Sequence, residues 1–483
     1  MEGEEHQVSV RGEKWHLLLS TVVDGGYCIG CGACAVSEES PIRIVKDEIG
    51  RYQAVLAHDV TDVMNVTEGL EVCPFSGHGA NEDQIGESLF PEAPRQDSFL
   101  GRHHECFVGY VEEGAFRQRG SSGGLAKWIL AELLAQGLGD KVIQVMEGES
   151  GDAKLYKFAV MDSVEQVVAG AKSVYYPVEM SEVLQHVAEN QGRYAITGVP
   201  CFIKAVRLLG QANHLFAERI RYTIGIVCGH LKTSRYAEML GWQLGVPPTE
   251  LASIDFRKKL PGRRANEKGV RVTSIKENAE VKPDTIVQNL FGSAYALSFM
   301  QYRACEFCDD VVGETADVSV GDAWLPEFVE DGRGASVLIV RNAKILELLR
   351  NGISNNRLSL KTIESERAAE SQEAGFRQRR EGLAYRLWLA DRKGVWRPPK
   401  RVESSADHIS THRRKIYELR SQLAASSHTA FAKARERGSF EVFQQEMSTL
   451  VRKYRLLSQG TMLNRIRARV SRKARGILGY FKN

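Results

Sequence analysis

Four cysteines near the start of the chain constrain its fold more than any other feature. Cys28, Cys31 and Cys34 follow one another at intervals of three residues, and the next cysteine is Cys73, directly before a proline. In the contiguous bacterial motif C-x2-C-x2-C-x3-C-P, the fourth cysteine ligates a second, neighbouring cluster. Here that position reads Glu38-Glu39-Ser40-Pro41. The spacing therefore predicts one 4Fe-4S cluster, held by these four cysteines, at which electrons enter the protein.

The alternative for these four cysteines is zinc, which also accepts four thiolates. Zinc motifs usually present two separated C-x2-C pairs, whereas three cysteines at successive short spacings can wrap three corners of one cubane. The pattern therefore favours the iron–sulfur cluster.

The cysteine content also indicates a reducing compartment. The chain has 483 residues and nine cysteines, and its acidic, polar first residues show no signal-peptide pattern. Because no uninterrupted apolar stretch of about 18 residues is present, we expect no membrane span. Clustered thiols in such a protein are metal ligands rather than disulfides. We therefore predict a cytoplasmic metalloprotein.

The first hundred residues divide into a small module and a connection. Residues 20–80 are rich in glycine and cysteine, with strands expected at 42–45 and 52–56, and we interpret them as a ferredoxin-like 4Fe-4S module. The polar, proline-containing stretch 81–102 is interpreted as a linker.

Residues 103–362 alternate the patterns of buried strands and helices, which predicts an α/β (α+β) domain with a mixed sheet. Strands are expected at 106–111, 141–145, 194–197, 220–227 and 335–340, and helices at 125–136, 181–190, 202–209 and 234–244. This central domain is expected to carry the chemistry.

Residues 363–483 are predicted to form a basic helical extension, with helices at 364–389, 409–425, 440–457 and 462–481. From residue 401 onward the chain has 18 Lys and Arg against 6 Asp and Glu, whereas the first 400 residues carry a net charge of −9. The extension is therefore expected to meet a partner protein, a second copy of the chain or, peripherally, the inner membrane, with nucleic acid the least favoured partner.

Four further cysteines lie at strand ends or in loops. Cys201 follows one expected strand, Cys228 ends another, and Cys305 and Cys308 form a C-x2-C pair. Because strand ends converge on the site of an open α/β sheet, these thiols are expected to meet at one metal. Spacing alone leaves a second cluster, a zinc knuckle and buried structural cysteines as alternatives. The ninth, Cys106, is expected to be an ordinary buried cysteine.

A glycine-rich loop, Gly120-Ser121-Ser122-Gly123-Gly124, precedes an expected helix. Such a loop can present backbone N–H groups to a phosphate or to the edge of a flavin. It matches neither the Rossmann nor the Walker A pattern, so a structural turn is the alternative.

Several motifs follow one another along residues 20–345. They are the CxxCxxC…CP series, the glycine-rich loop, Lys172-Ser-Val-Tyr175, Thr197-Gly-Val-Pro-Cys201, Cys228-Gly-His230, Asp255-Phe-Arg257, Cys305-x-x-Cys308-Asp309 and Ala316-Asp-Val-Ser-Val-Gly-Asp-Ala-Trp324. In this order they resemble the deazaflavin-coenzyme hydrogenase/dehydrogenase beta-subunit family. That family also includes 7-hydroxymethyl chlorophyll a reductase and ferredoxin-dependent divinyl reductases.

The resemblance implies FAD in the α/β domain and a second 4Fe-4S cluster on Cys201, Cys228, Cys305 and Cys308. It also implies a set of flavin-lining residues, namely Gly120, Ser121, Ser122, Gly123, Gly124, Lys172, Thr197, Gly198, Gly321 and Asp322. Clusters pass single electrons, whereas a flavin stores two, and hydride chemistry needs both together. Two clusters beside a flavin would therefore serve the reduction of a bound substrate.

The residues expected at the substrate are His230, Asp255, Arg257 and Lys258. Family members often carry Asp-Phe-Arg-x-Lys followed by Gly-Trp, but this chain continues Leu260-Pro-Gly-Arg-Arg264 without the Trp. The departure weighs against the family's deazaflavin as substrate, although the two arginines suit an anionic one. The alternatives are a solvated basic loop for this stretch and a hydrogen bond to the cluster for His230.

The sequence thus predicts an FAD-dependent iron–sulfur oxidoreductase that receives electrons from reduced ferredoxin, or a similar low-potential donor, and reduces a small-molecule substrate. One alternative is a deazaflavin-coenzyme oxidoreductase working as the beta subunit of a larger complex. The other is a non-catalytic electron-transfer or redox-sensing protein.

Overall fold

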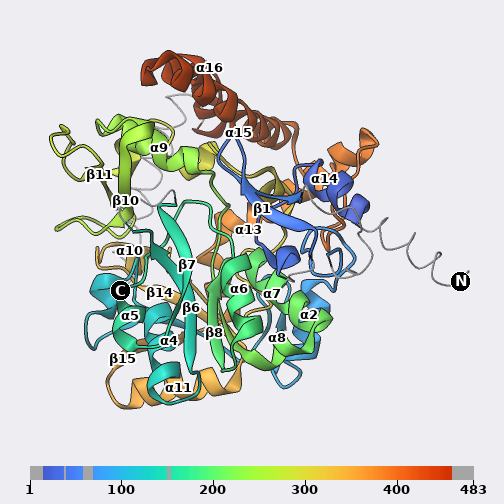
Figure 1. Cartoon of the computed structure of the whole chain (residues 1–483), viewed down its shortest axis with the longest axis vertical. Coiled ribbons are helices and arrows are strands. Elements are labelled where there is room, and N and C mark those ends of the chain that lie inside the picture. Colours follow the sequence, from blue (N-terminus) through green and yellow to red (C-terminus); the bar gives the residue numbers. More distant parts are fainter. Residues whose placement is uncertain (1–14, 37–39, 58–68, 150–153, 460–483) are drawn as a thin grey trace, which may run out of the picture.

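The computed structural model describes residues 15–36, 40–57, 69–149 and 154–459 of the chain. A large mixed sheet with helices on both faces forms the body, and the cysteine-bearing hairpin and the C-terminal helices pack around its upper end (Figure 1). This architecture confirms the predicted α/β class. The ferredoxin-like and FAD-binding assignments, and the predicted domain bounds, stay predictions.

Eight strands form the central sheet. They are β5 (Glu105–Val111), β6 (Lys141–Glu147), β7 (Tyr156–Met161), β8 (Tyr194–Gly198), β9 (Ile220–Ile226), β13 (Val318–Asp322), β14 (Ser336–Val340) and β15 (Leu358–Ile363). Their order is β15-β5-β14-β13-β9-β8-β6-β7. The pairings give β5, β13, β9, β8 and β6 one direction, because β14 is antiparallel to both β5 and β13. The carboxyl ends of these five strands therefore share one edge, where open α/β sheets bind their ligands.

Helices cover both faces of this sheet. One face packs against α4 (Leu125–Ala135), α5 (Val164–Ala169) and α11 (Ala343–Ser354), and the other against α6 (Ser181–Glu189), α7 (Pro200–Ala212) and α8 (His214–Arg219). Strand β14 is buried at every position, as expected of a strand between two helical layers. Shorter helical turns are α3 (Phe116–Arg119), α10 (Pro326–Val329), Pro248–Glu250, Val287–Asn289, Tyr295–Leu297 and Arg303–Phe307.

The strands and helices expected in residues 103–362 are all present, with ends shifted by up to three residues. Strands β7 and β15 and the small second sheet were not expected. The second sheet consists of β10 (Leu251–Lys258), β11 (Gly269–Ser274) and β12 (Thr285–Ile286). Cys106 is fully buried in β5, as predicted.

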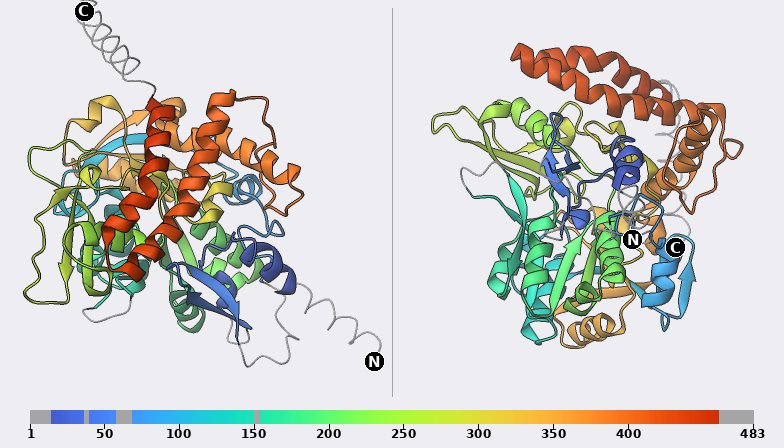
Figure 2. Two further views of the ribbon diagram at one scale, coloured as in Figure 1. Left: turned by 90° about the horizontal axis from the view of Figure 1, so that it is seen from above. Right: turned by 45° about the vertical axis from the view of Figure 1, so that its right-hand side comes forward.

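The long C-terminal helices are part of the folded body. α15 (Thr411–Arg437) and α16 (Phe440–Gln459) lie side by side and share a core with the second sheet and α9 (Ser234–Gln243) (Figure 2). Phe431 and Phe443 meet edge to face across them, with ring centroids 5.5 Å apart. Within the described residues, these two helices included, no helix combines the length and apolarity needed to cross a bilayer.

The cysteine-bearing segment folds around the predicted hairpin. β1 (Ile42–Lys46) and β2 (Tyr52–Leu56) pair antiparallel, with a helical turn at Leu18–Val23 and a tighter one at Ala33–Ala35 before them. The buried side chains of this segment belong to the same hydrophobic core as α6 and α7. The hairpin is therefore fused to the body through a shared core.

The linker predicted at 81–102 is wrong, because this stretch is folded. It forms α2 (Glu82–Leu89) and the hairpin β3 (Arg95–Asp97) and β4 (Gly101–His103). Asn81 accepts a hydrogen bond from the Gln84 backbone, and the Gln84 side chain accepts one from the Asn81 backbone. This reciprocal capping box starts a helix, so the polar residues here are structural.

The single helix predicted at 364–389 is also wrong. The stretch forms α12 (Ser365–Glu370), α13 (Glu373–Arg379) and α14 (Glu381–Arg392), and its breaks let Arg379 and Arg386 turn inward, where both are buried. The helix expected at 409–425 continues to Arg437, and the one at 440–457 is confirmed. The helix expected at 462–481 lies outside the described residues.

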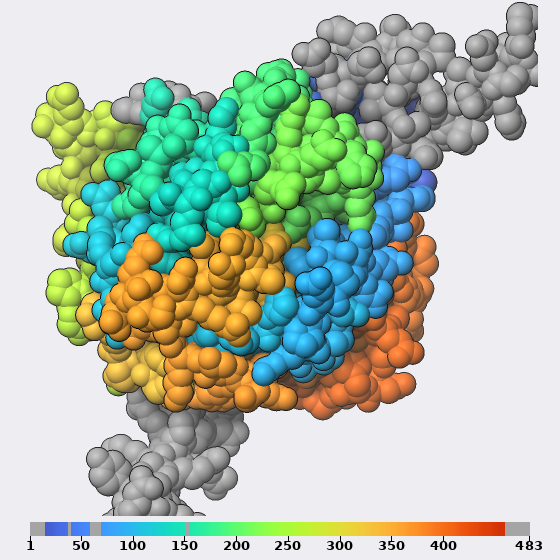
Figure 3. Space-filling model, turned by 90° about the horizontal axis from the view of Figure 1, so that it is seen from below, coloured from blue at the N-terminus to red at the C-terminus, as the bar shows by residue number. Residues whose placement is uncertain are grey.

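The extension is tied to the body by ion pairs around Arg401. Its guanidinium lies 2.9 Å from Asp83, 2.7 Å from Glu314 and 3.4 Å from Asp309. In Figure 3 the segment around α2 (blue) lies at the surface beside the extension (orange-red). The extension therefore braces the region that carries Cys308.

Candidate functional site

The structure brings together Cys28, Cys31, Cys34 and Cys73. Burial raises the pKa of each thiol, and charge on neighbouring cysteines of the group raises those of Cys31, Cys34 and Cys73 further. The Cys28 sulfur accepts backbone hydrogen bonds from residues 30 and 54, at 3.4 and 3.5 Å. Four thiols this close together, partly or fully buried, ionise only beside compensating positive charge, which a metal centre supplies.

Two glycines let the segment from Cys28 to Cys34 pack tightly. Gly30 and Gly32 have φ of +63° and +89°, in the region that other residues rarely adopt. A Cβ on Gly30 would lie 2.3 Å from the Tyr52 carbonyl oxygen, and one on Gly32 would lie 2.6 Å from the Ser181 nitrogen. Both glycines are therefore needed for the close contact with β2 and α6.

A second group of four cysteines is assembled from three parts of the fold. Cys201 lies in the first turn of α7, Cys228 follows β9, and Cys305 and Cys308 lie in and just after the turn Arg303–Phe307. All four line one small cavity. Burial raises the pKa of Cys201, and charge on the other three raises it further. Their binding of a cluster stays a prediction.

Neither group is arranged around a single ion. Among the residues that the structure describes, no set of three or more His, Cys, Asp or Glu side chains could hold one metal ion. Zinc requires its sulfur ligands at about 2.3 Å from one point. A 4Fe-4S cluster spreads its ligands over the corners of a cube, so its cysteines stand farther apart.

The two cysteine groups are neighbours. Ile29 and Phe75, from the first segment, line the cavity that the second group surrounds. After burial and its own group, the next cause that raises the pKa of Cys201 is charge on Cys31. The short separation suits electron transfer from one group to the other.

The residues expected at a flavin gather at the carboxyl edge of the central sheet. The glycine-rich loop follows β5 and α3, Thr197 and Gly198 end β8, and Gly321 and Asp322 end β13. The Ser121 hydroxyl accepts a hydrogen bond from the Ser173 nitrogen at 2.7 Å, which ties the loop to the segment of Lys172. Cys201 and Cys228 follow β8 and β9 at the same edge. The predicted flavin residues therefore adjoin the second cysteine group, and flavin binding stays a prediction.

Two ion pairs join predicted substrate residues to predicted flavin residues. Lys172 Nζ lies 2.6 Å from Asp255 Oδ2, and Arg257 donates two hydrogen bonds to Asp322, at 2.6 and 2.8 Å. Burial lowers the pKa of Arg257, but Asp322 and Tyr175 together raise it above its ordinary value, so the guanidinium stays charged. Asp255 and Arg257 therefore hold neighbouring side chains in place.

His230 and Lys258, the other predicted substrate residues, take part in neither of these ion pairs. His230 is buried and stacks on Tyr295, with ring centroids 3.8 Å apart. Burial, followed by the charge of Lys232, holds its pKa well below the usual range, so the imidazole is neutral at pH 7. Its role, proton delivery or a hydrogen bond to the cluster, stays a prediction. Lys258 is partly exposed and pairs in register with Gly269.

A cluster of cations around the glycine-rich loop was not expected. Lys259 Nζ donates to the backbone carbonyls of Arg117 and Ser122, and Lys268 Nζ to that of Gly332. Burial and then nearby positive charges lower the pKa of Lys259 to about 7 and that of Lys268 to about 8. Crowded cations of this kind suit an anionic ligand. Only the fold distinguishes them from solvated surface lysines.

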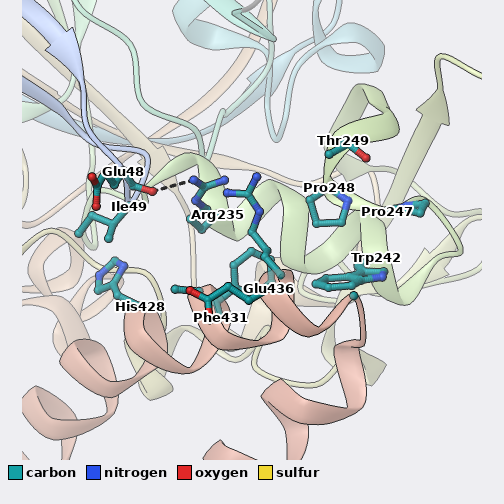
Figure 4. A pocket seen from close by; sticks show the side chains of 13 residues that line it. Glu48, Ile49, Arg235, Trp242, Pro247, Pro248, Thr249, His428, Phe431 and Glu436 are labelled. Carbon is teal, nitrogen blue, oxygen red and sulfur yellow. Dashed lines mark hydrogen bonds between the residues drawn. The ribbon is translucent and has the colours of Figure 1, made fainter.

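A separate cavity of about 440 Å³ is lined by no cysteine and by none of the predicted site residues. It lies between the β1–β2 turn, α9 and α15, and Figure 4 shows Arg235, Trp242 and Phe431 around it. Arg235 donates to the Glu48 carbonyl at 2.7 Å and pairs with Glu238. This cavity therefore lies at the contact between the hairpin and the C-terminal helices.

Comparison with known proteins identifies relatives of the chain. The sequence models of the coenzyme F420 hydrogenase/dehydrogenase beta subunit match residues 106–185 (N-terminal region) and 191–366 (C-terminal region). An uncharacterized protein of Methanocaldococcus jannaschii is 24% identical over 354 residues, covering 67% of this chain and 86% of that protein. The coenzyme F420-dependent sulfite reductase of the same organism is 22% identical over 441 residues, covering 82% of this chain and 61% of that protein.

Among solved structures, a chain of the F420-reducing NiFe hydrogenase complex of Methanosarcina barkeri matches with a TM-score of 0.48 at 16% identity. The match covers 63% of this chain and 99% of that one. The two matched family regions together span more than half of the present chain and contain the second cysteine group and the whole predicted flavin edge. The chain therefore belongs to the coenzyme F420 hydrogenase/dehydrogenase beta-subunit family.

Proposed function

We propose that this protein is an iron–sulfur flavoprotein oxidoreductase that moves electrons between coenzyme F420 and a one-electron partner protein. The observation that carries the proposal is a continuous arrangement of three features. The first cysteine group adjoins the second, and the second adjoins a cation-rich sheet edge. One-electron and two-electron sites side by side are what such an exchange requires.

The eight grouped cysteines fit two 4Fe-4S clusters. Cys28, Cys31, Cys34 and Cys73 would hold one, and the second cysteine group the other. Bound clusters supply single-electron transfer. The protein's own contribution is burial, which excludes water, and backbone N–H groups such as those that donate to Cys28.

The carboxyl edge of the sheet fits FAD. Lys259 and Lys268 provide positive charge that a pyrophosphate would neutralise, and the Gly120–Gly124 loop lies directly beside Lys259. Bound FAD supplies the exchange between single electrons and electron pairs. The pairs Lys172–Asp255 and Arg257–Asp322 would orient the polar groups around it.

Family membership favours coenzyme F420 as the two-electron partner. A relative that aligns with 82% of this chain is named a coenzyme F420-dependent sulfite reductase. Reduction of a deazaflavin takes up two electrons and two protons, so the one-electron partner must deliver two electrons in turn. In the reverse direction, the reduced coenzyme gives up the same electrons and protons.

A second candidate is reduction of another small molecule with electrons from reduced ferredoxin. The stretch Leu260-Pro-Gly-Arg-Arg264, which replaces the frequent Gly-Trp of the family, favours it. Arg263 and Arg264 are exposed there, and Arg264 pairs with Glu330 at 3.1 Å. An anionic substrate would meet these arginines.

The partner protein is proposed to bind near the first cysteine group, with help from the basic extension. Exposed cations of α15 and α16, such as Arg437 and Lys453, suit an acidic partner. The predicted contacts with a second copy or with a membrane surface depend in part on residues 462–481, outside the described residues.

An anaerobic titration tests the proposed function. The protein, reduced with dithionite and freed of excess reductant, should be reoxidised by oxidised coenzyme F420, with loss of the deazaflavin absorbance. Reoxidation by a small anionic acceptor but not by F420 would favour the second candidate. Reoxidation by neither would point to electron relay without substrate chemistry.

Metal analysis tests the two cysteine groups. We expect four irons for each group and FAD as the extracted flavin. Cys34→Ala should remove four irons, whereas Cys106→Ala, which changes a buried cysteine outside both groups, should remove none. Bound zinc, or iron for one cluster only, would refute the two-cluster proposal.

A further inference from the structure

Arg379 enters the second cysteine group from outside the family regions. It is the last residue of α13, beyond residue 366, where the family match ends. Its side chain is buried, 2% exposed, and lines the same cavity as all four cysteines of the group. The helical extension therefore contributes a cation to a site that the family regions otherwise build.

Part of the Arg379 guanidinium has no hydrogen-bond partner among the residues that the structure describes. Nη2 donates to the carbonyl oxygens of Cys228 and Gly229, at 3.0 and 2.7 Å. Nε and Nη1 are buried and have no hydrogen-bond partner. A buried guanidinium with free N–H groups is costly unless an anion meets them. The sulfur atoms of the second group are the anions that face this cavity.

The electrostatics point the same way. Burial raises the pKa of Cys228 to about 11, and the first of the charges that oppose this rise is Arg379. Arg379 is likewise the first opposing charge at Cys305 and Cys308. Its positive charge thus acts on the group as a whole.

At the first cysteine group, the cations that the described residues supply are paired with carboxylates. The charges that lower thiol pKa values there are Arg51 at Cys28 and Lys204 at Cys73. Arg51 pairs with Asp47 at 2.8 Å, and Lys204 pairs with Glu82 at 3.1 Å. Both are neutralised by carboxylates, so the two groups differ in local charge.

We propose that Arg379 donates its two free N–H groups to sulfur atoms of the second cluster and makes that cluster easier to reduce than the first. The proposal rests on the proposed function only in requiring both clusters. Positive charge and hydrogen bonds to sulfur stabilise the reduced, more negative cluster, which raises its reduction potential. Transfer of an electron from the first cluster to the second, which has the higher reduction potential, would then be thermodynamically favourable.

A redox titration followed by electron paramagnetic resonance tests this proposal on the complete protein. The wild type should show two cluster midpoints, and Cys34→Ser, which alters the first cluster, assigns them. In Arg379→Gln the midpoint of the second cluster should move to a more negative potential while that of the first stays in place. The matched control is Arg377→Gln, also in α13, whose side chain is 45% exposed and pairs with Glu373.

Arg379→Lys keeps the charge but loses the planar set of donors, so its second midpoint should lie between those of wild type and Arg379→Gln. If Arg379→Gln loses four irons, the test passes to Arg379→Lys. A second-cluster midpoint equal to that of the wild type in Arg379→Lys would then overturn the proposal. An unmoved second midpoint in Arg379→Gln, or an equal shift of both, overturns it too. A wild type without two clusters would instead refute the proposed function.

Discussion

Lys259 shows how the fold changes the chemistry of a single residue. An exposed lysine stays charged to about pH 10. Burial, followed by the charges of Lys268, Arg117, Lys172 and Arg257, lowers the Lys259 pKa to about 7. The residue is therefore charged below neutral pH and uncharged above it, unless an anion binds beside it and restores the proton.

The first prediction follows from this pKa. Affinity of the flavin-free protein for FAD should be full below pH 7 and should fall, roughly tenfold for one lost charge, as the pH rises toward 9. Lys259→Met should bind more weakly below pH 7 and show a flatter profile, because the pyrophosphate itself does not titrate there. Calorimetric titration across this range measures the effect.

The control for this prediction is Lys344→Met, since Lys344 is an exposed residue of α11 that pairs with Glu347. Its profile should match that of the wild type. An unchanged pH profile in Lys259→Met would show that this lysine does not meet the phosphates.

At the scale of elements, the segment that follows α14 acts as a brace. Arg401 joins Asp83, in the first turn of α2, to Asp309 and Glu314 around Cys308. The last two carboxylates are buried. Lys400 adds a pair with Asp309 at 3.4 Å. The stretch around Arg401, which the sequence analysis assigned to the C-terminal extension, therefore holds the loop that carries Cys308 in place.

The second prediction concerns this brace. Arg401→Met should lower the free energy of unfolding by about 3–5 kcal/mol, because it removes a cation that two buried carboxylates share. Arg397→Met removes a more exposed pair with Asp391 and should cost about 1 kcal/mol or less. Urea unfolding of both variants measures the difference, and equal losses would show that the Arg401 network adds nothing beyond a surface ion pair.

At the scale of the whole molecule, the protein orders its redox sites by position. The hairpin carries the first cysteine group, the shared core brings it against the second, and the sheet edge follows. Because transfer between sites depends on their separation, this order supports the proposal that the first group faces a one-electron partner.

The third prediction tests that order. In Cys28→Ala, reduction of the flavin by a one-electron donor such as ferredoxin should be abolished, while reduction by the reduced deazaflavin should continue, because it needs no cluster. Stopped-flow absorbance distinguishes the two reactions, and Cys106→Ala should leave both intact. Unchanged reduction of the flavin by the one-electron donor would show that electrons do not enter through the first cysteine group.

Much of this organisation was predictable from local patterns. The hairpin, the apolar strands such as β14 and the cysteine spacing are short-range signals, and their elements lie close to the expected positions. The stretch 81–102 was misread because a capping box at Asn81 resembles a polar loop in composition. The turn inward at Arg379 had no local signal, since a basic helix usually faces solvent.

The sequence by itself determined the first set of cysteines, the α/β class and, through the order of its motifs, the family, because ligand spacing and strand periodicity are local properties of the chain. Only the tertiary structure decided that the two sets adjoin, that Lys259 and Lys268 surround the glycine-rich loop, and that the extension delivers Arg379 to the second group. These contacts join residues far apart in the chain, and burial then sets their charge. Neither the long-range contacts nor the burial can be predicted from the local sequence.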